Sequence, residues 1–200
     1  MKFEGEYLNG KRNGKGKEYK ISKDEIFEIN YKYDYYETMF EGEYKNGERN
    51  GKGKEYDKYG RIVFDGEYLN GKRNGFGKEY DIYGKLKFEG EYLNGKRNGE
   101  GKLFEVGNIV FHGEFINGER NGNGKEFYDG RLKFEGKYSK DKRNGNGKEF
   151  KNGEIIFEGI YMNGQRWKGK GKEYYDSKGI LIYENEYDNG KKLEKNPYFK

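Results

Sequence analysis

The sequence predicts an all-β protein, an elongated and twisted antiparallel sheet of tandem β-hairpins stacked in a solenoid-like array. A five-residue motif, aromatic-Glu-Gly-Glu-aromatic, begins at Phe3 and recurs about every 23 residues from Phe40 onward. A fixed period of this length is typical of repeat architectures. Apolar residues and Gly alternate with charged residues around each motif, as in Leu-Lys-Phe-Glu-Gly-Glu-Tyr at residues 86–92, which is the period of a β-strand. Ala is absent and Gly occurs 34 times, so helix is disfavoured.

Each repeat contains two predicted strands. The first strand carries the five-residue motif, Asn-Gly forms the turn, and a second strand reads Gly-x-Gly-Lys-Glu-aromatic. Asn-Gly between two alternating segments is the strongest short-range signal for a hairpin. The register of the second strand stays open, because Gly77 and Tyr80 have opposite parity and the aromatic ring can lie on either face.

The whole chain, residues 1–200, reads as one repeat array. Full repeats are predicted to start near residues 3, 40, 64, 88, 111, 134 and 157. The long first step of 37 residues is explained by a truncated repeat at 27–39. A degenerate C-terminal repeat covers 183–192, and residues 193–200, which contain the only Pro, form a terminating segment.

The core is expected to consist of aromatic rings packed over Gly. Aliphatic residues are too few for an ordinary core, a composition typical of disordered chains, but there are 21 Tyr and 14 Phe. A ring lying over the bare backbone of a neighbouring Gly would bury both. The predicted aromatic column comprises Phe3, Tyr7, Phe40, Tyr44, Phe64, Tyr68, Phe88, Tyr92, Phe111, Phe115, Phe134, Tyr138, Phe157 and Tyr161. The structural glycines are Gly5, Gly42, Gly66, Gly90, Gly113, Gly136 and Gly159.

The composition excludes several classes of enzyme. There is no Cys and one His, so a thiolate or two-histidine metal site cannot form within the chain, and we expect neither a metal nor a cofactor. Ser occurs three times and Thr once, which disfavours a hydroxyl nucleophile. Carboxylates are abundant, but their identical placement in nearly every repeat does not provide the unique environment that a catalytic pair needs. We therefore predict no enzymatic activity.

The repeated pattern Tyr/Phe-x-Gly-x-Tyr, then Asn-Gly and Gly-x-Gly, resembles the MORN (membrane occupation and recognition nexus) repeat. The resemblance extends from residue 3 to about residue 190. It implies an elongated β-array that acts as a non-catalytic scaffold or recognition module, often at membranes or cytoskeletal structures. The second aromatic of the family is usually Trp, whereas here it is Tyr or Phe. The only Trp, Trp167, lies in a turn with one extra residue.

A cation follows nine residues after each leading aromatic residue. This row, which we expect at the hairpin tips along one edge, comprises Arg12, Arg49, Arg73, Arg97, Arg120, Arg143, Arg166 and Lys192. Two hypotheses remain open: charges that keep the edge soluble, or an edge that binds an anionic partner. The Lys-Glu pairs of the second strands, such as Lys54 and Glu55, are expected to be a solvated face with cross-strand ion pairs. His112 replaces an outward-facing Glu and reads as a surface substitution.

The leading functional hypothesis is a scaffold that docks protein partners, or its own copies through the terminal sheet edges, along an aromatic-lined sheet. One alternative is a peripheral membrane module that binds anionic phospholipid headgroups through the Arg/Lys edge. Another is a targeting or regulatory module for an enzyme on another chain. Nucleic acid is disfavoured because the net charge of +5 is spread along the array. Without a visible leader or a membrane-spanning apolar segment, we expect a cytoplasmic protein, peripheral to a membrane or the cytoskeleton.

Overall fold

The chain is seen in a computed structural model that describes residues 1–26, 31–175 and 180–193; at 21–26, 31–36, 173–175 and 180–183 it describes the backbone only. The described residues contain sixteen β-strands and no helix. They divide into two compact units, Met1–Arg97 and Asn98–Lys200. The first unit contains β1 (Lys2–Leu8), β2 (Lys11–Ile26), β3 (Tyr31–Lys45), β4 (Glu48–Tyr56), β5 (Ile62–Leu69), β6 (Lys72–Tyr80) and β7 (Leu86–Leu93). The boundary lies in β8 (Lys96–Glu105), and the second unit continues with β9 (Asn108–Ile116), β10 (Glu119–Tyr128), β11 (Arg131–Ser139), β12 (Lys142–Lys151), β13 (Glu154–Met162), β14 (Gln165–Tyr175), β15 (Ile180–Asp188) and β16 (Lys191–Leu193).

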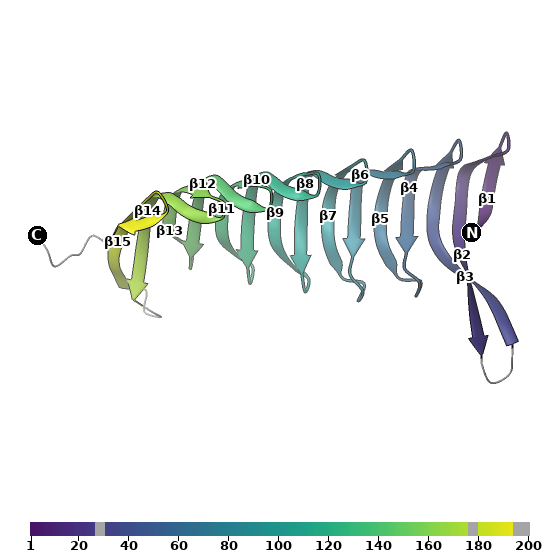
Figure 1. Cartoon of the computed structure of the whole chain (residues 1–200), viewed down its shortest axis with the longest axis horizontal. Helices are drawn as coiled ribbons and strands as arrows, with labels where there is room; N and C mark the ends of the chain where they lie inside the picture. The colour runs from purple at the N-terminus through teal and green to yellow at the C-terminus, as the bar shows by residue number, and fades with distance from the viewer. Residues whose placement is uncertain (27–30, 176–179, 194–200) are drawn as a thin grey trace, which may run out of the picture. The chain divides into compact units, whose positions relative to one another are not determined.

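Within each unit, strands that follow one another in the sequence pair antiparallel and lie side by side (Figure 1). This arrangement confirms the predicted all-β class and the tandem-hairpin topology. Connections are short because consecutive strands are neighbours, so contacts stay local in the sequence.

Tight turns join the two strands of each hairpin. At Asn9-Gly10 both residues have positive φ, 49° and 73°, as a type I′ turn requires. Asn-Gly recurs at this place in the other hairpins, with one exception: Lys140 and Asp141 adopt φ of 49° and 63° without a Gly. The local sequence therefore specifies the turn type directly.

The truncated repeat predicted at 27–39 begins on residues 27–30, which lie outside the described residues, and it stays a prediction. Residues 31–39 belong to β3, and β2 pairs with this strand as far as Ile26 opposite Tyr31. Figure 1 shows the paired ends of β2 and β3 projecting beyond their neighbours. The described part of this segment therefore lengthens two strands.

A β-bulge, which recurs in the hairpins β1–β2, β3–β4, β5–β6, β9–β10, β11–β12 and β13–β14, resolves the register that the sequence left open. Gly66 pairs with Gly77 and Tyr68 with Arg73, so one residue of β5 lies opposite three of β6. A second register shift follows Glu79, where β6 pairs with β7. The two extra residues of β6 leave Arg73 and Gly77 on the same face, over the Phe64 ring. The terminal aromatic residue of the second strand has the opposite parity and points away from the aromatic column, as shown by the Tyr19 hydroxyl, which donates to Glu4 at 3.0 Å.

The core is a single column of rings on one side of the sheet, which we call the aromatic face. Phe and Tyr residues from Phe40 to Tyr161 in the predicted column are at most 4% exposed. Each interior Tyr packs edge-on between two Phe rings: the ring centroid of Tyr68 lies 5.1 Å from that of Phe40 and 5.7 Å from that of Phe64. Such T-shaped pairs contribute beyond their buried area. Tyr7 contacts Phe3 and is 58% exposed.

Paired glycines form the floor beneath the rings. A Cβ on Gly66 would stand 2.6 Å from the Cα of Gly77 and 2.7 Å from the Phe64 ring. A Cβ on Gly77 would stand 2.4 Å from the same ring. These distances are far below van der Waals contact, so the close approach of ring and backbone requires Gly at both positions of the pair.

Candidate functional site

The arginines of the predicted cationic row cover the aromatic column rather than stand at the hairpin tips, which corrects the expected placement. Arg73 lies within β6 opposite Tyr68, one position inside the strand. Its guanidinium carbon lies 4.0 Å from the Phe64 ring centroid, and Arg49 lies 4.1 Å from that of Phe40. A guanidinium is planar and weakly hydrated, so it stacks on an aromatic ring at low desolvation cost. The same stacking is found for Arg12, Arg97, Arg143 and Arg166 at 4.5, 4.3, 4.2 and 4.9 Å.

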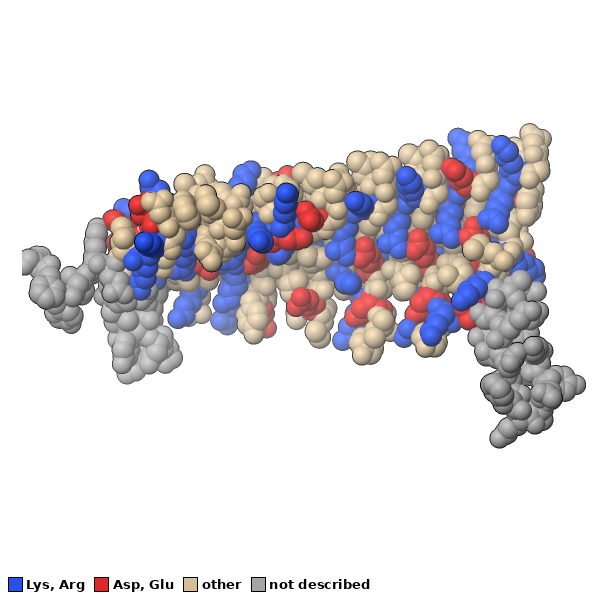
Figure 2. Space-filling model, viewed as in Figure 1, with Lys and Arg blue, Asp and Glu red and all other residues tan. Residues whose placement is uncertain are grey.

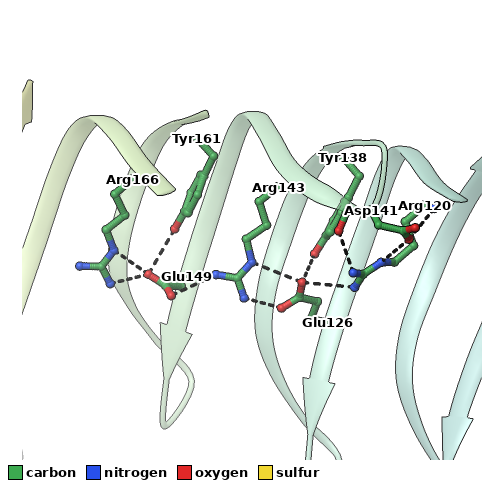
Figure 3. Close-up of polar contacts among 8 residues, drawn as sticks. All are labelled: Arg120, Glu126, Tyr138, Asp141, Arg143, Glu149, Tyr161 and Arg166. Carbon is green, nitrogen blue, oxygen red and sulfur yellow. Dashed lines mark hydrogen bonds and ion pairs between the residues drawn. The ribbon is translucent and has the colours of Figure 1, made fainter. Parts of the chain in front are cut away.

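Each of these arginines is joined to Glu residues in what we call the Arg–Glu ladder. Arg73 pairs with Glu55 of the preceding hairpin at 2.5 Å and more loosely with Glu79 of its own at 3.8 Å. The Tyr68 hydroxyl donates to the same Glu55 at 2.8 Å. Figure 3 shows the ladder in the second unit, where Glu126 joins Arg143 and Tyr138, and Glu149 joins Arg143, Tyr161 and Arg166. Sequence reasoning missed these contacts because it placed Glu55 and its equivalents on the solvated face beside Lys.

The ladder shifts the ionisation of its members. Burial opposes the charge on Glu55, but the hydrogen bond and the charge of Arg73 outweigh it, so the pKa of Glu55 is lowered. The pKa values of Glu79 and Glu126 are lowered by the same balance, with Arg97 and Arg143 as the partners. Burial and the Glu55 carboxylate raise the pKa of Tyr68, which therefore stays protonated and donates. The arginines are committed to internal carboxylates, which leaves little of the anion-binding capacity that the sequence suggested.

The opposite side of the sheet, which we call the charged face, carries an open groove in each unit. In the first unit the groove has a volume of about 760 Å³, and its floor includes Gly16, Gly42 and Gly53. In the second unit it has a volume of about 810 Å³ above Gly113, Gly124, Gly136, Gly147 and Gly159. Because side chains of the glycine positions would project toward the aromatic face, the groove floor is bare backbone. We call this feature the charged groove.

One wall of the charged groove is a row of alternating Lys and carboxylate residues. Lys54 pairs with Asp65 at 3.5 Å, and Lys148 with Glu158 at 3.2 Å. Figure 2 shows bands of Lys and Arg side chains with Asp and Glu between them. His112 takes a carboxylate position in this row, and its Nε2 lies 2.8 Å from Glu100 Oε1. Its side chain is 38% exposed, in keeping with a surface position.

Comparison with known protein families identifies the repeat. The family model for the MORN repeat matches residues 3–24, 40–58, 64–81, 88–108, 111–130 and 134–155, more than half of the chain. The chain belongs to the MORN repeat family. No curated protein is similar enough to count as a relative. MORN repeats are generally non-catalytic.

The MORN hairpin predicted near residue 157 lies outside the matched segments, although it has the same strands. β13 and β14 pair Gly159 with Gly169 and Tyr161 with Arg166. Trp167 lies within β14 and not in the turn that the sequence suggested, and the extra residue changes the pairing so that Gly169, the first Gly of Gly-x-Gly, lies opposite Gly159. An insertion in the strand thus preserves the aromatic column while changing the local sequence pattern.

The MORN pattern also contains a groove position that sequence reasoning overlooked. The middle residue of Gly-x-Gly lines the second wall of the charged groove at Lys15, Lys52, Glu100, Asn123 and Asn146. Phe76 on β6 and Lys170 on β14 occupy the same position of the motif in other repeats. The signal was present in the sequence as a variable position between two constant Gly residues.

The Arg–Glu ladder of this MORN array is interrupted at Leu103, which stands where Glu55 stands in its own repeat. Arg120 consequently turns to Asp141, with its Nε at 3.1 Å from the carboxylate and its backbone N–H donating to the same oxygen at 3.0 Å (Figure 3). Its guanidinium carbon lies 5.3 Å from the Phe111 ring, farther than in the intact rungs. The missing carboxylate explains the displaced stacking.

Leu103→Glu is expected to restore the rung and raise the free energy of unfolding by about 1 kcal/mol, the net value of one added hydrogen bond. Leu103→Gln keeps the shape without the charge and serves as the control. Asp141→Asn should destabilise the wild type more than the Leu103→Glu variant, as measured by urea denaturation. Equal effects of Asp141→Asn in both backgrounds would contradict the restored rung.

Within residues 1–26, 31–175 and 180–193, no group of three or more His, Cys, Asp or Glu residues could hold a metal ion. Among the same residues there is no helix of the length and apolarity needed to cross a bilayer.

Proposed function

We propose that this MORN array is a scaffold that binds a protein partner in the charged groove. The observation that carries the proposal is the groove itself, an open channel with a backbone floor and polar walls that is present in both units. A backbone floor permits close approach of another chain, and charged walls favour selective association over tight apolar burial.

The aromatic face is poorly suited to the same task. Its interior rings are at most 4% exposed, and the Arg–Glu ladder lies over them. A partner would have to break internal ion pairs to reach the rings. The aromatic-lined docking surface expected from the sequence therefore moves to the opposite face of the sheet.

The test uses the absence of Cys, because one introduced thiol can be labelled uniquely. Lys148→Cys places a thiol in the groove on β12, and Lys142→Cys places one at the hairpin tip of the same strand. Modification with a polyethylene glycol maleimide should abolish binding of co-purified proteins at the groove position and leave it intact at the tip. Each partner is then purified and titrated against both labelled forms. Retained binding by the groove-labelled chain would contradict the proposal, and light scattering distinguishes a second copy from a different protein.

Binding to a lipid surface is the competing function. The exposed residues at the hairpin tips support it better than the arginines, which are paired with Glu residues. Leu69 and Leu93, directly before the turns, are 49% and 50% exposed, and Lys72 and Lys96, directly after the turns, are exposed. Apolar and cationic groups side by side suit an anionic bilayer surface. Sedimentation with phosphatidylserine vesicles that is blocked by the tip label and unaffected by the groove label would support this function instead.

A further inference from the structure

We infer that the charged groove of the first unit recognises an extended protein segment carrying an acidic, a second acidic and an apolar side chain, each three residues apart. Lys15 and Lys52 in the groove, and Phe76 beyond its end on β6, are the residues that contact this segment. This inference rests on the proposed function, since it specifies what the groove binds.

The first wall of the groove is occupied by its own ion pairs. Lys17 pairs with Glu41 at 3.2 Å, and Lys54 with Asp65 at 3.5 Å. Both ion pairs join a Lys on one strand to a carboxylate on the next strand. The charges of this wall are balanced by internal ion pairs, and its residue types are the same in successive hairpins. The wall therefore contributes little to discrimination between partners.

The carboxylates beside the middle residues are committed to the β-bulge. Glu6 accepts a hydrogen bond from the backbone N–H of Lys15 at 3.0 Å. The Oε2 atoms of Glu43 and Glu67 lie 2.2 Å from the points where a Cβ on Gly51 and Gly75 would stand. These carboxylates hold the tight backbone of the bulge, so their role is structural.

The middle residues of Gly-x-Gly are the remaining side chains that can contact a partner. The side chains of Lys15 and Lys52 line the groove, are exposed, and take part in no ion pair with another residue in the part of the first unit that the structure describes. Phe76 follows in the same row on β6, and it is 49% exposed although it is a large apolar ring. An exposed aromatic residue amid charges is a typical anchor in protein interfaces. Two cations next to it select acidic side chains.

The spacing follows from strand geometry. The three residues lie on β2, β4 and β6, two strands apart, which is about 10 Å per step. An extended segment in the polyproline II conformation has three residues per turn and advances about 3.1 Å per residue, so every third side chain lies on the same side and successive ones are about 9 Å apart. The row changes in the second unit to Glu100, Asn123 and Asn146, so the inference concerns the first unit alone.

The probe is a displayed library of random twelve-residue peptides, selected against the full chain. Peptides selected by the wild type should contain acidic-x-x-acidic-x-x-apolar in either direction. Their affinity should fall at least tenfold for the Lys15→Glu/Lys52→Glu double variant and for Phe76→Ala. The Lys11→Glu/Lys72→Glu double variant makes the same charge change at the tips and should bind as the wild type does. Selection against Lys15→Glu/Lys52→Glu should return basic residues at the two acidic positions.

The experiment distinguishes a wrong peptide pattern from a groove that binds no peptide. A labelled Lys54→Cys chain, blocked in the groove, first shows which peptides bind there. Groove-bound peptides that lack the pattern, or that ignore the Lys15→Glu/Lys52→Glu change, would overturn the inference and leave the docking function standing. If no selected peptide is displaced by the groove label, the groove of the first unit does not bind peptides and the inference fails, whereas the Lys148→Cys label in the second unit tests the docking function separately.

Discussion

Gly77→Ala is expected to lower the free energy of unfolding by about 3 kcal/mol, at the upper end of the cost of overpacking a core. The new methyl group would stand 2.4 Å from the Phe64 ring and 3.3 Å from Tyr92. Neither ring can retreat, because Phe64 is fully buried beneath Arg73 and between two Tyr rings. The sheet has one side-chain layer over this face, so a displaced ring loses its whole environment.

Gly71→Ala is the matched control for this prediction. Gly71 has φ of +76°, and no atom lies within 4 Å of the position its Cβ would take. The change therefore carries the strain of a left-handed residue, roughly 1–2 kcal/mol, without a clash. Urea denaturation followed by far-UV circular dichroism measures both. A Gly77→Ala variant no less stable than Gly71→Ala would show that the ring does not depend on the bare backbone.

Glu55→Gln is expected to cost about 2 kcal/mol, the scale of a hydrogen bond to a charged group. Glu55 is the acceptor shared by Arg73 at 2.5 Å and Tyr68 at 2.8 Å, and its side chain is 22% exposed. The amide keeps the shape but removes the charge that balances the two flanking arginines. The cost should exceed that of an ordinary surface pair because these groups are largely withdrawn from water.

Asp65→Asn provides the comparison, since the Lys54–Asp65 pair has side chains 45% and 41% exposed. Exposed pairs contribute about 0–1 kcal/mol. The lowered pKa values of Glu55, Glu79 and Glu126 add a pH test. Their stabilisation is complete above the ordinary Glu pKa of 4.5 and is lost as the pH falls through the lowered values. Stability that is flat from pH 7 to pH 3, or equal losses in Glu55→Gln and Asp65→Asn, would contradict the role of the ladder.

The Arg–Glu ladder explains how this chain builds a core with few aliphatic residues. A single sheet normally needs a helix or a second sheet to cover its apolar face. Here the guanidinium groups stack on the Phe rings, and Glu55 and its equivalents join consecutive hairpins. A layer of side chains takes the place of a second layer of secondary structure.

Much of the fold could be predicted from local patterns. Asn-Gly pairs such as Asn9-Gly10 adopt the positive φ values of a tight turn because of short-range sterics. The alternation of apolar and charged residues around Phe88 indicates a strand. The period fixes the order of the hairpins, because each repeat contacts mainly its neighbours in the sequence. The long pairing of β2 with β3 was not predicted, because a decayed copy of the motif does not indicate where a strand ends.

The repeat, the hairpin topology, the MORN family and the role of Gly and aromatic residues in one column follow from the amino-acid sequence. The partners of the charged side chains follow only from the three-dimensional packing. Glu55 and Arg73 belong to different hairpins, and the pairing of β4, β5 and β6 brings them together over the Phe rings, while Lys54 points to the groove. Alternation along one strand predicts the face on which a side chain lies but not its partner on another strand, which depends on the register between the strands. The same register places Lys15 and Lys52 in the groove, with Phe76 next in their row on β6.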